Sequence, residues 1–381
     1  MRFPAEAIWQ AIAPLVPNFS VEVLPAPPEV DSFGGGLKRT SQLRRAWLFA
    51  RHVVPYGARF AAVLRERRAQ IAHYNNTRSI LLAGVGASLL RVPKIWHVRG
   101  DERSMGLFAK SSALFADRIV CVADAVQTSV PRARRSKCRT VYNGIEPPTA
   151  PPTRTREELV GSLASPLGSP LTLAPEDRLL VSIGSIVPFK GNHHLLEACA
   201  VLARQHPEAA RRLVVVLVGD EPYPDYGRHL HRVAGVVAGV VAGVRVRFAG
   251  WDDRPLDWAR ASDAVILPTV EREELVVEGE RTVIHGTEGF SRTVLEAMSC
   301  ARPVLATRVA GAPEQVVAGE TGWLFPPSDP VALAETLRGW LETSAERQRS
   351  MGDAGLRRVV ERFSMKRTVE GTLGVYRELV R

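Results

Sequence analysis

Residues 286–307 read GTEGFSRTVLEAMSCARPVLAT, and the interpretation of the whole chain begins with them. Glu288 and Glu296 flank a short amphipathic segment in which Ser291 and Thr293 are suitable helix starters, so Glu288 should lie in a loop and Glu296 in the helix after it. The first turn of such a helix offers unpaired N–H groups and a positive dipole end, which suit a diphosphate. Carboxylates beside a phosphate are favourable only if they accept hydrogen bonds from sugar hydroxyls. The segment therefore predicts a nucleotide-sugar pocket.

The same residues carry a resemblance to a known family. The succession Glu-Gly-Phe, Leu-Glu-Ala-Met and Pro-Val-x-Ala-Thr resembles the Glu-x7-Glu signature of retaining glycosyltransferases with the GT-B architecture, in particular glycosyltransferase family 4. The resemblance covers most of the chain and is strongest over residues 179–327. It implies an α/β fold with two Rossmann-like, doubly wound domains facing a cleft. The alternative for the signature is an ordinary surface helix with two solvated glutamates.

The composition fits a soluble chain with two domains. The sequence has 381 residues, 45% of them hydrophobic, which is enough for two sizeable cores. Its 50 Lys and Arg against 40 Asp and Glu give a net charge of +10, which favours anionic partners. Nucleic acid is not expected among them, because only the charge supports it and no recognised binding motif does.

Cysteine usage and hydropathy bear on the compartment. The four cysteines have no metal-ligand spacing, so neither a disulfide framework nor a cysteine zinc site is expected. The sequence shows no secretory signal and no apolar run of the roughly 18 to 20 residues that a membrane span needs. We expect a cytoplasmic protein, with peripheral contact on the inner face of the membrane as an open alternative.

Residues 1–150 are predicted to form the first, acceptor-side domain. Its beginning is unusual, with a helix at 5–15 before a buried strand at 20–24, whereas a doubly wound domain normally opens on a strand and a Gly-rich loop. We therefore expect this domain to lack its first strand. Residues 38–68 form a basic, helix-periodic segment, which is either a face for acidic membrane or an anionic acceptor, or a solvated face beside a core stripe.

Strands alternating with a helix predict a parallel sheet in this domain. The expected strands are 70–75, 94–98 and 118–122, and the expected helix is 78–90. His97 then lies at the carboxyl end of a strand, where open α/β sheets bind ligands. In the resembling family a histidine near this place faces the reacting sugar. His97 is the closer chemical match, Arg99 fits an alternative register, and a purely structural histidine remains open.

A composition shift separates the two predicted domains. Residues 151–178 are rich in Pro, Thr and Ser and are expected to be a linker. The second, nucleotide-sugar-binding domain should span 179–364, and a last helix at 365–381 should cross back onto the first domain. Strands are expected at 179–183, 213–219, 245–250, 264–268 and 303–307, and helices at 192–204, 330–342 and 344–363.

The resemblance also implies roles for residues of the second domain. Lys190 matches the family's diphosphate-binding lysine, whereas Ser185 stands where the family has an arginine, a contact that Arg292 could replace. By resemblance, Glu296 binds the ribose and Glu288 the sugar ring hydroxyls. The predicted donor-binding residues are Gly184, Ser185, Lys190, Gly219, Glu288, Gly289, Phe290, Ser291, Arg292, Thr293 and Glu296, and the predicted catalytic residues are Glu288 and His97.

The implied reaction is transfer of a sugar, of hexosyl type, from a nucleoside diphosphate sugar to a cell-surface polysaccharide or glycolipid acceptor, with retained anomeric configuration. No Asp-x-Asp pair occurs, so no metal and no cofactor beyond the co-substrate is expected. The rival prediction is a catalytically silent or N-terminally truncated GT-B protein that binds nucleotide or acts as a partner subunit. The missing first strand and Ser185 motivate it.

Three local features carry further expectations. Residues 271–287 make the connection between the strand at 264–268 and the Glu-Gly-Phe motif longer than is usual in the family. They should form a hairpin or lid. The repeated Val-Ala-Gly-Val run at 233–244 should be a helix end and a loop. Ala301 stands where a glycine usually ends the signature helix, and an alanine in a left-handed cap costs on the order of 1 kcal/mol.

Overall fold

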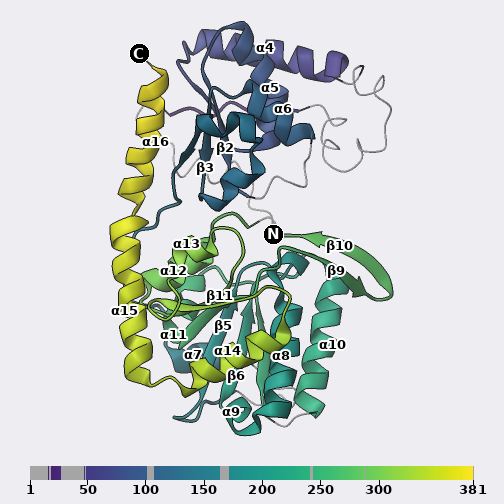
Figure 1. Ribbon diagram of the computed structural model, residues 1–381, viewed down its shortest axis with the longest axis vertical. Coiled ribbons are helices and arrows are strands. Elements are labelled where there is room, and N and C mark those ends of the chain that lie inside the picture. The colour runs from purple at the N-terminus through teal and green to yellow at the C-terminus, as the bar shows by residue number, and fades with distance from the viewer. Residues whose placement is uncertain are drawn as a thin grey trace.

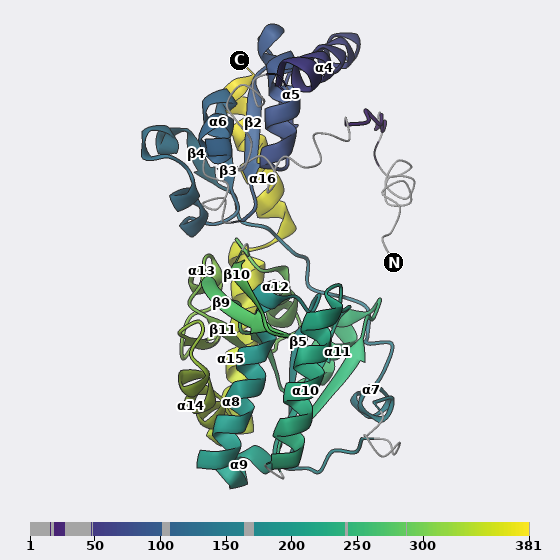
Figure 2. The same ribbon diagram turned by 90° about the vertical axis from the view of Figure 1, so that its right-hand side faces the viewer.

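The computed structural model has two lobes joined by a long C-terminal helix (Figures 1 and 2). It describes residues 16, 19–26, 47, 49–100, 107–163, 171–240, 243–286 and 288–380. The helix predicted at 5–15 lies outside these residues. None of the helices within them is both long enough and apolar enough to cross a membrane.

The first lobe contains a parallel sheet in the order β1-β2-β3-β4. Its strands are β1 (Ala72–Tyr74), β2 (Lys94–Val98), β3 (Arg118–Cys121) and β4 (Cys138–Thr140). The first three confirm the predicted strands, whereas β4 was not predicted. Helices α4 (Val54–Glu66), α5 (Thr77–Leu89) and α6 (Leu107–Phe115) lie on one side of this sheet (Figure 1).

The strand predicted at residues 20–24 is wrong. Residues 19–26 have no regular structure, and the Val23 side chain is 72% exposed. Within the described residues no strand precedes β1, whose only partner is β2. The segment lies against α4 instead, where the Tyr56 hydroxyl donates to the Leu24 carbonyl (3.2 Å) and Arg59 donates to the Pro25 carbonyl (3.4 Å). Two side-chain bonds from a helix replace the ladder that a strand would need.

The basic segment is helical in its described part, as predicted. A π-helical turn at Phe49–Val53 leads into α4. Helix α4 packs closely on α5, because a Cβ atom at Gly86 would overlap the carbonyl oxygen of Gly57. The cationic side chains of Arg51 in the π-helical turn and of Arg59 and Arg65 in α4 are exposed.

The second lobe contains a six-stranded parallel sheet in the order β12-β11-β8-β5-β6-β7. The strands are β5 (Arg178–Ile183), β6 (Leu213–Val218), β7 (Arg245–Gly250), β8 (Ala264–Leu267), β11 (Val304–Thr307) and β12 (Gly322–Phe325). All but β12 were predicted. Because β5 has β6 on one side and β8 on the other, the strand order reverses between β5 and β8, and such a switch point is where open α/β sheets bind ligands.

Helices cover both faces of the second sheet. One layer consists of α8 (Asn192–Gln205), α9 (Pro207–Arg211), α10 (Pro224–Val240) and α14 (Pro330–Glu342). The other consists of α7 (Arg156–Gly161), α11 (Pro255–Ala261), α12 (Arg292–Ser299) and α15 (Ala345–Arg362). A short helix, α13 (Ala312–Gln315), follows β11.

Helix α10 corrects the expectation for residues 233–244. It continues to Val240, although valine and glycine are poor helix formers. Leu230, Ala234 and Val237 are buried on its inner side. Packing against the sheet therefore outweighs the low intrinsic propensity.

The segment predicted as a linker is partly helical. Helix α7 begins with a capping box between Thr155 and Glu158. Arg156 donates to Asp263 (2.9 Å) and Leu159 is buried, so α7 packs against the second lobe.

Ala301 adopts the left-handed conformation that the sequence predicted, with φ of +53°. It follows the end of α12, and its N–H donates to the Met298 carbonyl (3.0 Å). The signature helix therefore ends on an alanine in a conformation that favours glycine, at a cost of about 1 kcal/mol.

The crossover of the last helix is confirmed. Helix α16 (Met365–Leu379) leaves the second lobe and runs along the first sheet, on the side opposite α4 and α5 (Figures 1 and 2). Val375 packs against Ile95 and Val120 in one buried cluster. Glu378 accepts hydrogen bonds from Arg118 (2.7 Å) and Arg139 (3.0 Å).

Candidate functional site

Two glycines shape the carboxyl edge of the second sheet. Gly184 follows β5 with φ of +131°, and Gly219 follows β6. A Cβ atom at Gly219 would overlap the Gly184 carbonyl oxygen, so the two loops lie against each other. Ser185, the residue in place of the expected arginine, donates from its hydroxyl to Asp220 (2.6 Å). The loop after β5 is therefore fixed by short polar and backbone contacts without a cation at position 185.

Lys190 and Glu288 meet at this edge, although 98 positions separate them. Lys190 ends a short 3-10 turn at Pro188–Lys190, and its ammonium forms an ion pair with the Glu288 carboxylate. Their side chains are 16% and 20% exposed. The structure thus brings the predicted phosphate-binding cation into contact with the predicted sugar-binding carboxylate, and each now neutralises the other.

The start of α12 is held by a residue that the sequence analysis missed. The Gln315 amide accepts from the Ser291 N–H (3.1 Å) and donates to the Ser291 carbonyl (2.7 Å). Gln315 is fully buried. The Ser291 hydroxyl does not cap the helix and has no hydrogen-bond partner within the described residues. No local pattern distinguishes a buried glutamine from the commoner surface one, so no sequence signal could have found it.

Two of the predicted donor-binding side chains are engaged elsewhere. The Thr293 hydroxyl donates to the carbonyl of Ile183, the last residue of β5 (3.3 Å). The Phe290 ring is buried between Tyr142 and Phe363, with ring centroids 5.2 and 5.3 Å away. Phe290 therefore packs where the two lobes meet, and it is the backbone groups of Phe290 and Thr293 that remain for a donor.

Arg292 and Glu296 form a pair one helical turn apart on α12. An Arg292 guanidinium nitrogen lies 3.3 Å from a Glu296 carboxylate oxygen. Arg292 is 78% exposed and Glu296 only 18% exposed. Glu296 is thus largely shielded from solvent, whereas its partner Arg292 is exposed.

The signature loop contacts the first lobe directly. A Cβ atom at Gly289 would overlap the carbonyl oxygen of Arg99, the residue after β2. Nearby, Glu314 accepts hydrogen bonds from the N–H groups of Asp124 (2.9 Å) and Ala125 (2.8 Å). A cavity of about 160 Å³ adjoins this contact, and its lining combines residues of both lobes with Glu288.

His97, in β2, is connected to α16 by a chain of hydrogen bonds through His73. Its Nδ1 is hydrogen-bonded to His73 Nε2 (3.2 Å), and His73 Nδ1 to the Tyr376 hydroxyl (2.8 Å). Burial, followed by the positive charges of Arg99 and His73, lowers the pKa of His97 to about 3. The imidazole is therefore neutral at physiological pH, and its Nε2 is buried without a hydrogen-bond partner among the described residues.

The contact at Gly289 bears on the two registers that the sequence left open. Arg99 meets the signature loop through its carbonyl group, and its guanidinium donates to Asn75 (3.2 Å). The His97 ring is instead hydrogen-bonded to His73 of β1, which is in turn bonded to Tyr376 of α16. The structure therefore brings Arg99, rather than His97, to the loop that carries Glu288.

The inserted segment after β8 is an antiparallel hairpin, as predicted. Its strands are β9 (Arg272–Val277) and β10 (Glu280–His285), and it projects from the second lobe (Figure 1). The turn residues Glu278 and Gly279 both have positive φ, +50° and +82°, as the tightest two-residue hairpins require.

Comparisons with known proteins agree with this geometry. The family model described as glycosyl transferases group 1 matches residues 177–343, and the model described as glycosyltransferase family 4 matches residues 20–148. A D-inositol 3-phosphate glycosyltransferase 2 from Catenulispora acidiphila is 28% identical over 270 residues, 68% of this chain and 56% of that protein. The spore coat protein SA of Bacillus subtilis is 27% identical over 269 residues, 68% of this chain and 64% of that protein. The chain spans about half the length of the curated relatives it matches.

Solved structures show the same fold. Anabaena Alr3699/HepE in complex with UDP and glucose superposes with a TM-score of 0.70 at 20% identity, covering 98% of this chain and 89% of that chain. The sucrose-phosphate synthase of Thermosynechococcus elongatus gives a TM-score of 0.65 at 20% identity, covering 95% and 86%. These likenesses confirm the predicted architecture of two Rossmann-like domains.

Proposed function

Because the chain belongs to glycosyltransferase family 4, among the group 1 glycosyl transferases, we propose that it moves a sugar from a nucleoside diphosphate sugar to an acceptor hydroxyl with retained anomeric configuration. The Lys190–Glu288 pair is the observation that carries the proposal. It lies beside the start of α12, at the edge where the strand order reverses. A cation and a hydroxyl acceptor are thus together where a sugar diphosphate needs both.

In the proposed reaction the donor separates this pair. The diphosphate competes with Glu288 for the Lys190 ammonium, because phosphate oxygens form strong charge-assisted hydrogen bonds. Glu288 is then free to accept a hydrogen bond from a sugar hydroxyl. Lys190 and the first N–H groups of α12 stabilise the charge that leaves with the nucleotide, a role that needs no metal ion.

The bond changes balance without a protein nucleophile. The bond from the anomeric carbon to the diphosphate oxygen breaks, and a bond from the same carbon to the acceptor oxygen forms on the same face. The proton of the acceptor hydroxyl passes to the leaving diphosphate. The share of the enzyme is orientation and charge stabilisation in the cleft between the lobes.

The relatives support candidates for the donor and for one class of acceptor. Structures of HepE contain UDP and UDP-glucose, which supports UDP sugars as the first donors to test. For the acceptor we propose a glycan or a lipid-linked sugar of the cell surface. The relatives named for D-inositol 3-phosphate support a small phosphorylated polyol as the second candidate.

Calorimetric titration with UDP, GDP and ADP tests the donor site. We expect one of them to bind, and we expect Lys190→Ala and Glu296→Ala each to weaken its binding by about tenfold or more, since a hydrogen bond to a charged group contributes about 1.5 to 3 kcal/mol. Lys366→Ala is the control, because Lys366 is an exposed lysine of α16. A folded wild-type chain that binds none of the three would instead support a catalytically silent protein.

We also propose that α4 contacts acidic membrane from the cytoplasmic side. Arg51 and Arg65 are exposed on or beside this helix, as are the apolar side chains of Trp47 and Val54. Each basic residue near an anionic surface contributes about 1 kcal/mol. Flotation with phosphatidylglycerol vesicles should therefore weaken by about an order of magnitude or more in the double variant Arg51→Glu and Arg65→Glu. Reversing the exposed Arg349 and Arg357 of α15 should have no such effect, and equal losses in both double variants would argue against a face on α4.

A further inference from the structure

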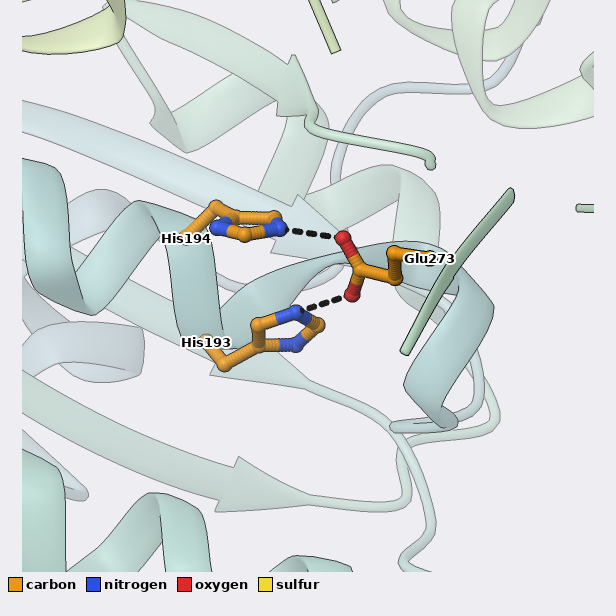
Figure 3. A group of neighbouring side chains, drawn as sticks. All are labelled: His193, His194 and Glu273. Atoms are coloured by element: carbon orange, nitrogen blue, oxygen red, sulfur yellow. Dashed lines mark hydrogen bonds and ion pairs between the residues drawn. The ribbon is translucent and has the colours of Figure 1, made fainter. Parts of the chain in front are cut away.

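Two histidines and a glutamate meet where the inserted hairpin joins α8. His193 and His194 lie in the first turn of α8, and Glu273 lies in β9. Their side chains converge on the glutamate, with His193 Nε2 2.6 Å from one carboxylate oxygen and His194 Nε2 2.6 Å from the other (Figure 3). The His193 residue is 1% exposed, and the side chains of His194 and Glu273 are 15% and 11% exposed, so the cluster is largely shielded from solvent.

Second partners fix the direction of both rings. His193 Nδ1 is hydrogen-bonded to the Tyr226 hydroxyl (2.9 Å), and His194 Nδ1 to the Glu197 carboxylate (3.1 Å). Each Nε2 is thereby directed at the Glu273 carboxylate, one at each oxygen. Histidines that bind metal ions are commonly held in this way, with the other ring nitrogen bonded to a carboxylate or another polar group.

We infer that His193 Nε2, His194 Nε2 and a carboxylate oxygen of Glu273 bind a divalent transition metal ion of the zinc class. The three atoms lie within 4.8 Å of one another. Zinc binds imidazole nitrogen and carboxylate oxygen at about 2.0 to 2.2 Å, so small side-chain rotations suffice to place the ion among them. Two imidazole ligands favour zinc and its neighbours over magnesium or calcium, which prefer oxygen ligands.

The location gives the ion a structural role. It would join the base of the hairpin to the first turn of α8, where His193 follows Lys190 by three residues. Beside this point the hairpin covers a cavity of about 360 Å³ between the loops before α8 and α10, with Phe189, Tyr226 and Leu275 in its lining. The ion fastens the hairpin over this cavity, and the proposed transfer chemistry does not use it.

Zinc titration of the untagged full-length chain, after treatment with chelator and desalting, tests the site. We expect one equivalent of zinc to bind, and we expect Glu273→Gln and His194→Ala each to weaken binding by about 100-fold or more. Glu197→Gln should weaken it by about 10- to 100-fold, since its carboxylate only orients His194. Glu274→Gln is the matched control, because Glu274 is the next residue of β9 and pairs with Arg281 on the hairpin surface.

Thermal unfolding gives an independent test of the inference. Zinc should raise the midpoint of thermal unfolding of the wild type and of Glu274→Gln, but not of Glu273→Gln, while magnesium should change none of them. A folded wild-type chain that binds no stoichiometric zinc would overturn the inference. So would a Glu273→Gln variant that binds zinc as tightly as the wild type, and the cluster would then be only a hydrogen-bonded fastening of the hairpin.

Discussion

Replacing Glu288 with glutamine is expected to lower kcat/KM for sugar transfer by about two to three orders of magnitude, the usual effect of removing one group that acts on the reacting centre. The affinity for the free nucleoside diphosphate should remain unchanged or increase. The physical reason is the ion pair with Lys190, because glutamine removes the carboxylate that competes with the diphosphate for this ammonium. Loss of turnover with retained nucleotide binding would place Glu288 at the sugar rather than at the nucleotide.

Transfer assays with a UDP sugar measure kcat/KM, and calorimetry with UDP measures the nucleotide affinity. Glu320→Gln is the matched control, since Glu320 is an exposed glutamate of the second lobe. If Glu288→Gln weakened nucleotide binding as much as it slowed transfer, Glu288 would have to be reassigned to the nucleotide. If it changed neither, the pair with Lys190 would have no part in nucleotide binding or transfer.

Much of this site could be predicted because its residues belong to local patterns. The Gly turn and Lys190 follow the buried strand β5, and Glu288 follows the hairpin that is inserted after the buried strand β8. In a parallel sheet the carboxyl ends of all strands meet at one edge. Resemblance to the family's motifs assigned Lys190 and Glu288 to one donor pocket, and the sheet geometry explains why both residues lie at the same edge. The left-handed Ala301 was predictable for the same reason, since a helix end is a local event.

Contacts between distant segments could not be predicted in this way. The amide of Gln315 holds both backbone groups of Ser291, and Gly289 fits against the Arg99 carbonyl, yet neither contact leaves a pattern within its own segment. The same holds for His193, His194 and Glu273, because the adjacent histidines are some eighty positions from the glutamate. The strand prediction around Val23 was wrong for the opposite reason. The local pattern is typical of a strand, but no described strand lies beside it for pairing.

Replacing Gly191 with alanine is expected to destabilise the second lobe by about 3 kcal/mol or more, because backbone strain and a steric clash both oppose the new Cβ atom. Gly191 lies between Lys190 and α8 with φ of +69°, a conformation that costs alanine about 1 kcal/mol. The added Cβ would also overlap the carbonyl oxygen of Pro268, at the end of β8. Because the overlapping atoms belong to the backbone of Pro268, the turn itself must shift.

The variant Gly250→Ala distinguishes the effect of backbone strain from that of the steric clash. Gly250 has the same φ of +69°, but a Cβ atom there would have no heavy atom of another residue within 4 Å. Gly250→Ala should therefore show the strain alone, about 1 kcal/mol or roughly 2 to 4 °C in the unfolding midpoint of a domain of this size. Gly191→Ala should lose about 6 to 12 °C by the same conversion. Equal losses in the two variants would mean that the turn relaxes without cost.

The same pair of variants tests how Lys190 is positioned. A shift of the turn at Gly191 displaces the Lys190 ammonium from the place where it would meet the diphosphate. The remaining folded protein should therefore bind the nucleoside diphosphate more weakly than the wild type at a temperature well below its midpoint. Gly250→Ala should bind it as the wild type does. The added Cβ atom contacts no donor-binding side chain itself. Weaker nucleotide binding in Gly191→Ala alone would therefore show that the packing of this turn against the end of β8 positions Lys190 for the donor.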